Sequence, residues 1–186
     1  MQPIIKPNKN WTLFLDRDGV INKEKVDDYI HHWDEFQFYD GVVDAIAELS
    51  LMFGKTIIVT NQKGIGKGVT MEENVHAIHD NLLQAVMAAG GNIDAVFYCP
   101  DTDSISPNRK PNPGMAFQAK EKFPSIDFKK SLMVGNNLSD LEFGRNAGMR
   151  NAFVRTTQPE LQIPGNMADI DTEDLPALLK YLKTVV

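Results

Sequence analysis

Short apolar runs alternate with amphipathic stretches along most of the chain, and this alternation restricts the fold more than any other feature. Strand–helix alternation of this kind makes βαβ units with right-handed crossovers. It therefore predicts an α/β fold: a three-layer αβα, Rossmann-like parallel sheet of about five strands with helices on both faces. We predict strands at 11–15, 55–60, 93–98, 131–135 and 151–154, and helices at 41–53, 72–89, 113–123, 139–147 and 175–184.

The composition is that of an ordinary globular protein. The chain has 186 residues, 42% of them hydrophobic, and one domain of about 100–200 residues is usual at this length. We expect residues 1–186 to form a single domain. No secretory signal is visible, and no apolar run approaches the ~20 residues that span a bilayer. These observations predict a cytoplasmic protein without a membrane partner.

The charge balance bears on the class of partner. Nineteen basic and twenty-five acidic residues give a formal net charge of −6 at pH 7. A chain of this sign is repelled by the nucleic-acid backbone unless it carries a local basic patch, and no long run of like charge is present. We therefore expect no nucleic-acid partner.

Polar and charged side chains follow the predicted strands at their carboxyl ends. Open α/β sheets place their functional groups at this edge, so the topology brings these segments together. The residues concerned are Asp16 and Asp18 after the first strand, Thr60, Asn61 and Gln62 after the second, Arg109 and Lys110 after the third, and 135–140 after the fourth.

The two aspartates after the first strand carry the most specific chemistry. Asp16 and Asp18 are spaced i, i+2, which puts both carboxylates on one side of an extended backbone. Two carboxylates ~4 Å apart repel by about 4 kcal/mol at an effective dielectric constant of 20, so they require a cation or one bound proton. Such a pair supplies a metal-held nucleophile for phosphorus and an acid for a leaving oxygen. The alternative is a turn-forming Asp-x-Asp-Gly on the surface.

Each of the other segments also has two interpretations. The hydroxyl and amide groups of 60–62 can donate to an oxyanion or simply form a turn. The cations at 109–110 can bind phosphate, because they lie near a predicted helix N-terminus, or they can form a solvated basic pair. Asn136 and Asp140 can complete an oxygen shell for Mg²⁺, or belong to a helix-capping turn.

Four motifs in this order resemble the haloacid dehalogenase (HAD) superfamily. Within it, the chain resembles the D-glycero-D-manno-heptose 1,7-bisphosphate 7-phosphatases and the related histidinol-phosphate phosphatases, over about residues 11–155. The resemblance implies a magnesium-dependent phosphatase that forms an aspartyl-phosphate and hydrolyses a small sugar phosphate. It favours the 7-phosphate of heptose bisphosphate, in heptose precursor biosynthesis. The motifs are Phe14-Leu-Asp-Arg-Asp-Gly-Val-Ile-Asn22, Val59-Thr-Asn-Gln62, Arg109-Lys-Pro-Asn-Pro-Gly114 and Met133-Val-Gly-Asn-Asn-Leu-Ser-Asp140.

The same resemblance implies roles for individual residues. Asp16 would be the nucleophile. Asp18 would protonate the leaving oxygen and later activate the hydrolytic water. Thr60 and Lys110 would hold the transferring phosphoryl group. Contacts with the substrate are implied for Arg17, Asn22, Glu24, Asp27, Asn61, Gln62, Lys63 and Arg109.

The implied metal site departs from the family pattern at one position. Mg²⁺ would bind Asp16, the backbone carbonyl of Asp18 and residue 136. The family usually has Asp at that position, whereas this chain has Asn136, which offers a neutral oxygen. Asp140 would supply negative charge through a bound water. We therefore expect an active phosphatase that needs more Mg²⁺.

A second departure concerns zinc. Members of this type commonly carry a zinc loop before Arg-Lys-Pro, but only Cys99 remains here and Asp101 stands where a His would be. We therefore expect no structural zinc, since a tetrahedral site lacks its ligands. The loop at 100–108 must then be ordered by its own turns or stay mobile.

Some interpretations stay open. The substrate could instead be histidinol phosphate, or Asn136 could make the chain a non-catalytic phosphosugar-binding domain. A nucleic-acid end phosphatase is disfavoured by the net charge. Segment 20–38 would be a flap in place of a large cap domain, and a monomer is expected. His76 and His79 are spaced i, i+3 and should lie on an exposed helical face rather than bind a metal.

Overall fold

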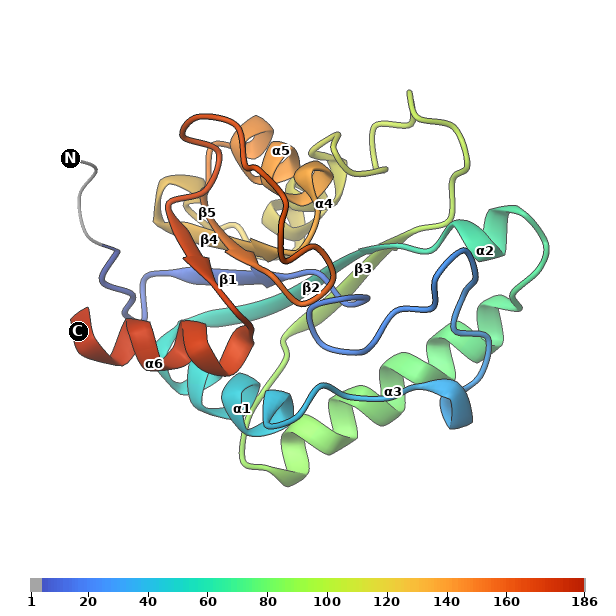
Figure 1. Ribbon diagram of the computed structural model, residues 1–186, viewed down its shortest axis with the longest axis horizontal. Coiled ribbons are helices and arrows are strands. Elements are labelled where there is room, and N and C mark those ends of the chain that lie inside the picture. The colour runs from blue at the N-terminus through green and yellow to red at the C-terminus, as the bar shows by residue number, and fades with distance from the viewer. Residues whose placement is uncertain (1–4, 186) are drawn as a thin grey trace.

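The computed structural model describes residues 5–185, which form one six-stranded sheet with helices on both faces (Figure 1). All neighbouring strands are parallel, in the order β3-β2-β1-β4-β5-β6. This arrangement confirms the predicted α/β fold. The strands are β1 (Thr12–Leu15), β2 (Lys55–Asn61), β3 (Ala95–Cys99), β4 (Ser131–Gly135), β5 (Arg150–Val154) and β6 (Ile170–Thr172). The helices are α1 (Val42–Met52), α2 (Lys63–Gly66), α3 (Glu72–Ala88), α4 (Gly114–Lys122), α5 (Leu138–Ala147) and α6 (Leu175–Val185), with short 3₁₀ turns at Trp33–Glu35 and Phe128–Lys130.

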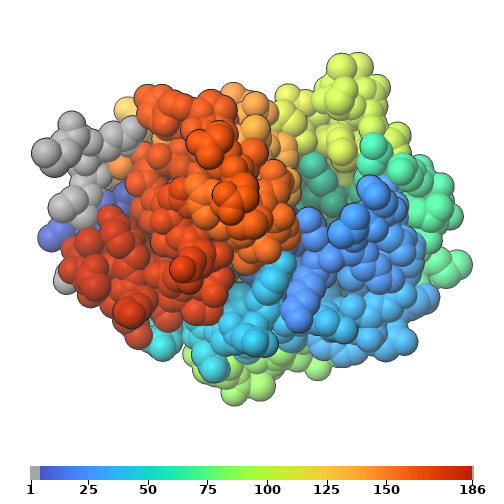
Figure 2. Space-filling view, viewed as in Figure 1, coloured from blue at the N-terminus to red at the C-terminus, as the bar shows by residue number. Residues whose placement is uncertain are grey.

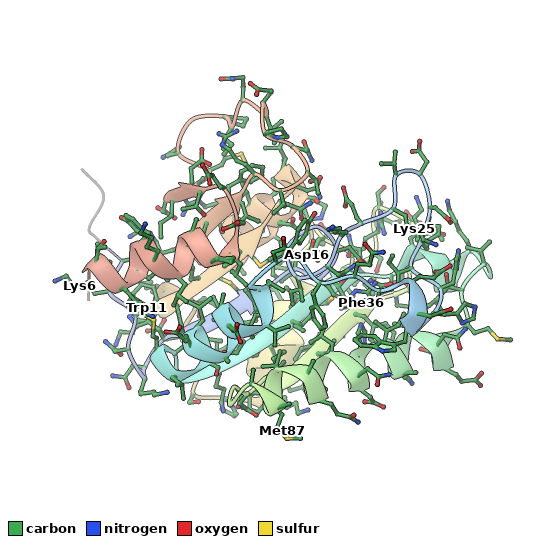
Figure 3. The ribbon with its side chains drawn as sticks, turned by 60° about the horizontal axis from the view of Figure 1, so that its bottom comes forward. Lys6, Trp11, Asp16, Lys25, Phe36 and Met87 are labelled. Carbon is green, nitrogen blue, oxygen red and sulfur yellow. The ribbon has the colours of Figure 1, made fainter. Side chains whose placement is uncertain are left out.

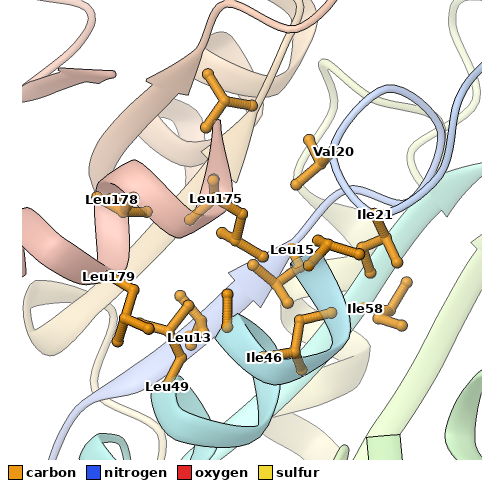
Figure 4. Packing of buried hydrophobic residues seen from close by; sticks show 14 of the residues in the cluster. Leu13, Leu15, Val20, Ile21, Ile46, Leu49, Ile58, Leu175, Leu178 and Leu179 are labelled. Atoms are coloured by element: carbon orange, nitrogen blue, oxygen red, sulfur yellow. The ribbon is translucent and has the colours of Figure 1, made fainter. Parts of the chain in front are cut away.

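Apolar side chains alternate between the two faces of the central strands, so both faces are covered. In β1, Leu13 and Leu15 point into one buried cluster and Phe14 into the other. Helices α1, α3 and α6 cover the first face, and α4 and α5 cover the second (Figure 1). Figure 4 shows the first cluster, where Leu178 of α6 and Leu49 of α1 pack beside β1. Within residues 5–185, no helix combines the length and apolar character that crossing a membrane requires.

The structure corrects the predicted number of strands and adds two local features. The sheet has a sixth strand, because residues 170–172 pair with β5 at its edge. The glycine-containing loop after β2 includes one helical turn, α2, closed by the Lys67 N–H bonding to the Lys63 carbonyl. The N-cap of α3 is Met71, and the hydroxyl of the preceding Thr70 pairs with His31 Nδ1 at 2.8 Å.

Segment 20–38 is mostly irregular, and aromatic packing holds it together. The rings of Trp33 and Phe36 stack with centroids 5.0 Å apart, and Phe36 meets Phe38 edge-on at 5.1 Å. Isolated bridges join Asn22 to Asp18 on one side and to Phe38 on the other. The segment therefore folds back over the end of β1, next to the carboxyl edge of the sheet.

A glycine allows α5 to pack closely against the strands that carry part of this edge. A Cβ added at Gly144 would lie 1.9 Å from Asn151 Oδ1 and 3.0 Å from Met133 Cβ. Asn151 cannot move freely, because its Nδ2 donates to the Leu141 carbonyl at 2.7 Å and to the Met167 carbonyl at 2.8 Å. The close packing of α5 against β4 and β5 therefore requires a residue without a side chain at position 144.

We expect Gly144→Ala to destabilise the protein. Helix propensity alone would favour Ala by about 1 kcal/mol. Overpacking costs about 1–3 kcal/mol, and a contact of 1.9 Å against a hydrogen-bonded, buried amide places the cost in the upper part of that range, at about 2–3 kcal/mol. The expected net loss is ~1–2 kcal/mol in the free energy of unfolding, measured by urea denaturation. Glu142→Ala, at an exposed position of the same helix, is the control and should change stability by less than about 0.5 kcal/mol. A Gly144→Ala variant as stable as the wild type would contradict the packing argument.

Candidate active site

The carboxyl ends of β1, β2 and β4 surround a small polar cavity, together with the loop after β3. Its volume is about 160 Å³. Asp16 lies at the end of β1 remote from Trp11 (Figure 3), and the surface is hollowed between segment 20–38, the loop after β3 and the segment after β5 (Figure 2). A wider hollow of about 490 Å³ lies at the opposite edge and contains none of the predicted residues. The polar cavity is lined by Asp16, Asp18, Glu24, Thr60, Asn61, Lys110, Asn137, Ser139 and Asp140.

A buried lysine joins two carboxylates at the centre of this site. Lys110 Nζ lies 2.8 Å from Asp16 Oδ1 and 2.7 Å from Asp140 Oδ1. Burial disfavours the charged amine, but Asp140 and Asp16 outweigh it and raise the pKa of Lys110 above its usual value. Asn61 fixes the backbone of Lys110: its Oδ1 accepts from the Lys110 N–H at 3.0 Å, and its Nδ2 donates to the Lys110 carbonyl at 3.1 Å. A cation is therefore held in place beside Asp16.

Asp16 is poised between ionised and protonated forms. Burial and the neighbouring charge of Asp140 raise its pKa to about 7, while Lys110 opposes the shift. Its Oδ1 also accepts the backbone N–H of Arg17 at 2.7 Å. Burial in the first place, and the charge of Asp140 in the second, therefore hold the pKa of this carboxyl above its usual value.

Asp18 has the opposite environment. Both its oxygens accept from Arg17, at 2.8 Å from Nη2, and Asn22 Nδ2 and Gln62 Nε2 donate to it at 2.9 Å each. Burial alone would raise the pKa of Asp18, but the charge of Arg17 and these hydrogen bonds hold it below its usual range. The same Gln62 amide also donates to Thr60 Oγ1 at 2.9 Å, which links the ends of β1 and β2.

Asn136 presents an oxygen that no protein group uses. The residue is fully buried, and its Nδ2 donates to Thr157 Oγ1 at 2.8 Å. Among residues 5–185, Asn136 Oδ1 has no hydrogen-bond partner. Gly19, at φ +87°, lies so close that a Cβ there would be 2.1 Å from Asn136 Nδ2. The backbone after Asp18 is therefore pressed against Asn136, and an orphaned oxygen of this kind fits a cation ligand.

Asp140 is occupied by protein donors. Its Oδ2 accepts the backbone N–H groups of Asn136 at 3.1 Å and Asn137 at 3.0 Å, and its Oδ1 meets Lys110. These contacts fix the start of α5 and hold Lys110 in place. The contribution of Asp140 to a metal through a bound water stays a prediction.

The structure separates the predicted substrate contacts into two groups. Glu24 and Asn61 line the cavity, and Gln62 lines an adjoining hollow of about 160 Å³. Burial, with the charges of Asp18 and Asp140, raises the pKa of Glu24. These residues remain placed to meet a bound molecule.

The other predicted contacts lie elsewhere. Arg17 and Asn22 are 1% and 0% exposed and donate to Asp18, and their direct contact with substrate stays a prediction. Asp27 is exposed, with φ at 57°, and Lys63 and Arg109 lie outside the residues that line the cavity. Arg109 Nη1 instead donates to the Asp101 carbonyl at 3.2 Å.

Sequence reasoning missed a set of supporting residues. Residues 156–158 follow β5 at the same edge: Thr156 donates to the Gly19 carbonyl, Thr157 accepts from Asn136, and Gln158 Nε2 donates to Asn137. Their position after a fifth strand end was the available signal. His79 was expected on an exposed face, but it is 5% exposed and lies 3.1 Å from Arg17. That expectation was wrong because segment 20–38 and Arg17 cover this part of α3.

The loop after β3 is ordered by its own hydrogen bonds. Ser106 donates to Asp101, Asn112 Nδ2 donates to the Ser106 carbonyl at 2.8 Å, and the Gly114 N–H donates to the Pro107 carbonyl at 2.8 Å. Cys99 is buried at its start. The loop is therefore ordered by its own turns, which is one of the two outcomes expected from the sequence.

Comparisons with known proteins are consistent with this geometry. Residues 107–163 match the model of the HAD-hydrolase-like family. A D-glycero-β-D-manno-heptose-1,7-bisphosphate 7-phosphatase of Photorhabdus laumondii is 34% identical over 183 residues, covering 92% of this chain and 96% of that protein. A D-glycero-α-D-manno-heptose-1,7-bisphosphate 7-phosphatase of Mycobacterium tuberculosis is 34% identical over 166 residues, covering 89% and 87%.

A solved structure shares the fold over nearly its full length. The D,D-heptose 1,7-bisphosphate phosphatase from B. bronchiseptica, crystallised with magnesium and phosphate, has a TM-score of 0.84 and 30% identity. The match covers 95% of this chain and 99% of that one. Sequence and structure therefore agree over the same span, and the chain belongs to the heptose-bisphosphate 7-phosphatase family of the HAD superfamily of hydrolases.

Proposed function

We propose that this protein removes the 7-phosphate of D-glycero-D-manno-heptose 1,7-bisphosphate, with Mg²⁺ and through a phosphorylated Asp16. The relatives named for this activity support the substrate, and they span nearly the whole chain. The observation that carries the chemistry is the buried Lys110, held between Asp16 and Asp140. We also propose that the chain acts as a cytoplasmic monomer of one domain.

The residues present fit a magnesium ion. Asn136 Oδ1 would bind it together with a carboxylate oxygen of Asp16 and the backbone carbonyl of Asp18. When bound, Mg²⁺ supplies positive charge against the phosphoryl oxygens and shields the nucleophile from the phosphate. The site favours a cation, because its carboxylates outnumber its cationic groups by two when all are ionised. The carboxylates are Asp16, Asp18, Glu24 and Asp140, and the cations are Arg17 and Lys110.

In the first step, a carboxylate oxygen of Asp16 attacks the phosphorus, and the bond between phosphorus and the sugar oxygen breaks. Lys110 and the Thr60 hydroxyl stabilise the transferring group, which is where positive charge and donors are most effective. Asp18, in its protonated form, gives its proton to the departing oxygen and releases an alcohol. The incoming phosphate adds negative charge beside Asp18 and thereby favours that protonated form.

In the second step, water attacks the phosphorus of the aspartyl-phosphate. Asp18, now ionised, takes a proton from the water, and the bond from phosphorus to the Asp16 oxygen breaks. Inorganic phosphate leaves, and both carboxyl groups return to their starting forms. The adjoining hollow shares Asp18, Glu24 and Asn61 with the cavity, so the remainder of a bisphosphate can extend into it, toward Glu24 and Gln62.

Asp16→Asn should abolish phosphate release, because the amide cannot form the acyl-phosphate. Activity on 4-nitrophenyl phosphate should fall to background, measured by release of nitrophenolate with Mg²⁺ present. Asp80→Asn, at an exposed position on α3, is the control and should keep wild-type activity. Substantial turnover by Asp16→Asn would refute the nucleophilic role.

The substrate is tested by a panel of phosphorylated metabolites assayed for phosphate release. The panel contains both anomers of heptose 1,7-bisphosphate, histidinol phosphate and a 5′-phosphorylated oligonucleotide. We expect kcat/KM to be highest for one heptose anomer, by at least about tenfold over histidinol phosphate. The reverse order would move the assignment to histidinol phosphate, and no turnover of any compound would favour a binding domain.

Asn136→Asp should lower the Mg²⁺ requirement. A carboxylate in place of the orphaned amide oxygen adds negative charge, and a gain of about 1 kcal/mol corresponds to roughly fivefold tighter binding. The measurement is half-maximal activity against Mg²⁺ concentration, alongside Mg²⁺ binding by calorimetry. Thr157→Val is the matched control, since it removes the partner of Asn136 Nδ2 without adding charge. The hypothesis fails if Asn136→Asp needs as much Mg²⁺ as the wild type.

A further inference from the structure

We infer that His79 is a positioning residue for Asp18, acting through Arg17; this inference rests on the proposed role of Asp18 as the acid. His79 lies on α3, sixty-two residues from Arg17 in the chain, and belongs to none of the motifs at the strand ends. It does not line the cavity, so its effect must pass through another side chain.

The contact is built into the interior. The Arg17 side chain is 1% exposed and His79 is 5% exposed. Arg17 Nη1 lies 3.1 Å from His79 Nε2, while Nε and Nη2 of the same guanidinium face Asp18 at 3.2 and 2.8 Å. Gln62 Oε1 accepts a further bond from Nη2 at 3.3 Å, and the Phe36 ring covers the group at 5.9 Å. One planar group thus joins α3 to the carboxylate.

The direction of the hydrogen bond follows from its partners. A guanidinium only donates, so His79 Nε2 must accept, and the ring is neutral with its proton on Nδ1. Burial and the charge of Arg17 lower the pKa of His79 to about 3, in agreement with a neutral ring. The imidazole therefore satisfies a buried N–H of Arg17 that Asp18 cannot reach.

This acceptor matters because Arg17 is planar. Fixing Nη1 at His79 fixes the rotation of the whole guanidinium, and with it the two-pronged contact to Asp18. Without the acceptor, the buried Nη1 donors would seek another partner and the plane would tilt. Asp18 would follow, and a displaced acid transfers its proton to the leaving oxygen poorly.

The chain offers a control one helical turn away. His76 lies three residues earlier on α3, is exposed, and its Nε2 pairs with the Tyr98 hydroxyl at 2.7 Å. Both histidine rings approach Tyr98, with centroid distances of 5.6 Å for His76 and 5.8 Å for His79. Of these two histidines, His79 is the one that contacts Arg17. Loss of an imidazole from this helix can therefore be separated from loss of the Arg17 acceptor.

The test compares two substrates that differ in their need for an acid. Heptose 1,7-bisphosphate releases an alcohol and needs a proton, whereas 4-nitrophenyl phosphate releases a stable phenolate and does not. We expect His79→Leu to lower kcat for the heptose substrate by about 10- to 100-fold, part of the 10²–10⁴ that a general acid supplies. For 4-nitrophenyl phosphate, the rate of nitrophenolate release in a single turnover should stay within about threefold, because it reports the first step alone, before Asp18 acts as the base toward water. Both substrates and Mg²⁺ are used at saturating concentrations, so that a change in KM does not alter the measured rates.

The conservative variant and the control complete the design. His79→Gln retains a neutral acceptor and should restore kcat for the heptose substrate to within about threefold of wild type. His76→Leu should leave both rates unchanged. If His79→Leu does not fold, Arg17→Lys removes the planar fork and is expected to show the same substrate-selective loss.

Each other outcome has a definite meaning. An equal fall on both substrates, or no fall on either, would overturn the positioning role. Asp18→Asn must itself show the selective loss on the heptose substrate; if it does not, the proposed acid role of Asp18 fails. If Asp18→Asn shows that loss and His79→Leu does not, the proposed function stands and the inference about His79 falls.

Discussion

The ion cluster of Lys110 with Asp16 and Asp140 is the interaction on which the site depends. Buried charges are costly to desolvate, and their attraction offsets that cost only when the geometry is accurate. This geometry comes from the sheet. Parallel pairing of β1 with β4 places Leu15 beside Val134, so Asp16 after β1 and Asp140 in the segment after β4 lie at the same edge. Asn61 also contributes, because its two hydrogen bonds hold the backbone of Lys110 at the end of β2.

The fold and the location of the site could be predicted because both depend on local patterns. Apolar runs and capping signals define strands and helices, and parallel topology then determines which strand ends meet. Side-chain directions after β1 could not be predicted in the same way. The side chains of Arg17 and Asn22 are buried because both donate hydrogen bonds to Asp18. Their positions also depend on Gln62, which follows β2 and donates to Asp18, and on His79 of α3, which contacts Arg17. Similarly, Thr157 gains its role only because β5 ends beside Asn136.

Asp16 and Asp18 show how two neighbouring carboxyl groups acquire different properties. They are two residues apart, yet one has its pKa raised to about 7 and the other has its pKa lowered. The difference lies in their partners: Asp16 faces Asp140 across Lys110, whereas Asp18 accepts from Arg17, Asn22 and Gln62. Divergent environments of this kind assign separate roles to chemically identical groups.

The amide at position 136 changes the charge balance of the same cluster. A carboxylate there would add a further negative group to a site whose nucleophile already resists ionisation. Asn136 avoids that repulsion, and its Nδ2 gains a bond to Thr157 that a carboxylate could form only by accepting from the hydroxyl. Its Oδ1 has no hydrogen-bond partner among the described residues. An amide at position 136 therefore reduces repulsion among the carboxylates while leaving an oxygen for the cation, so its effect should fall on metal affinity rather than on the fold.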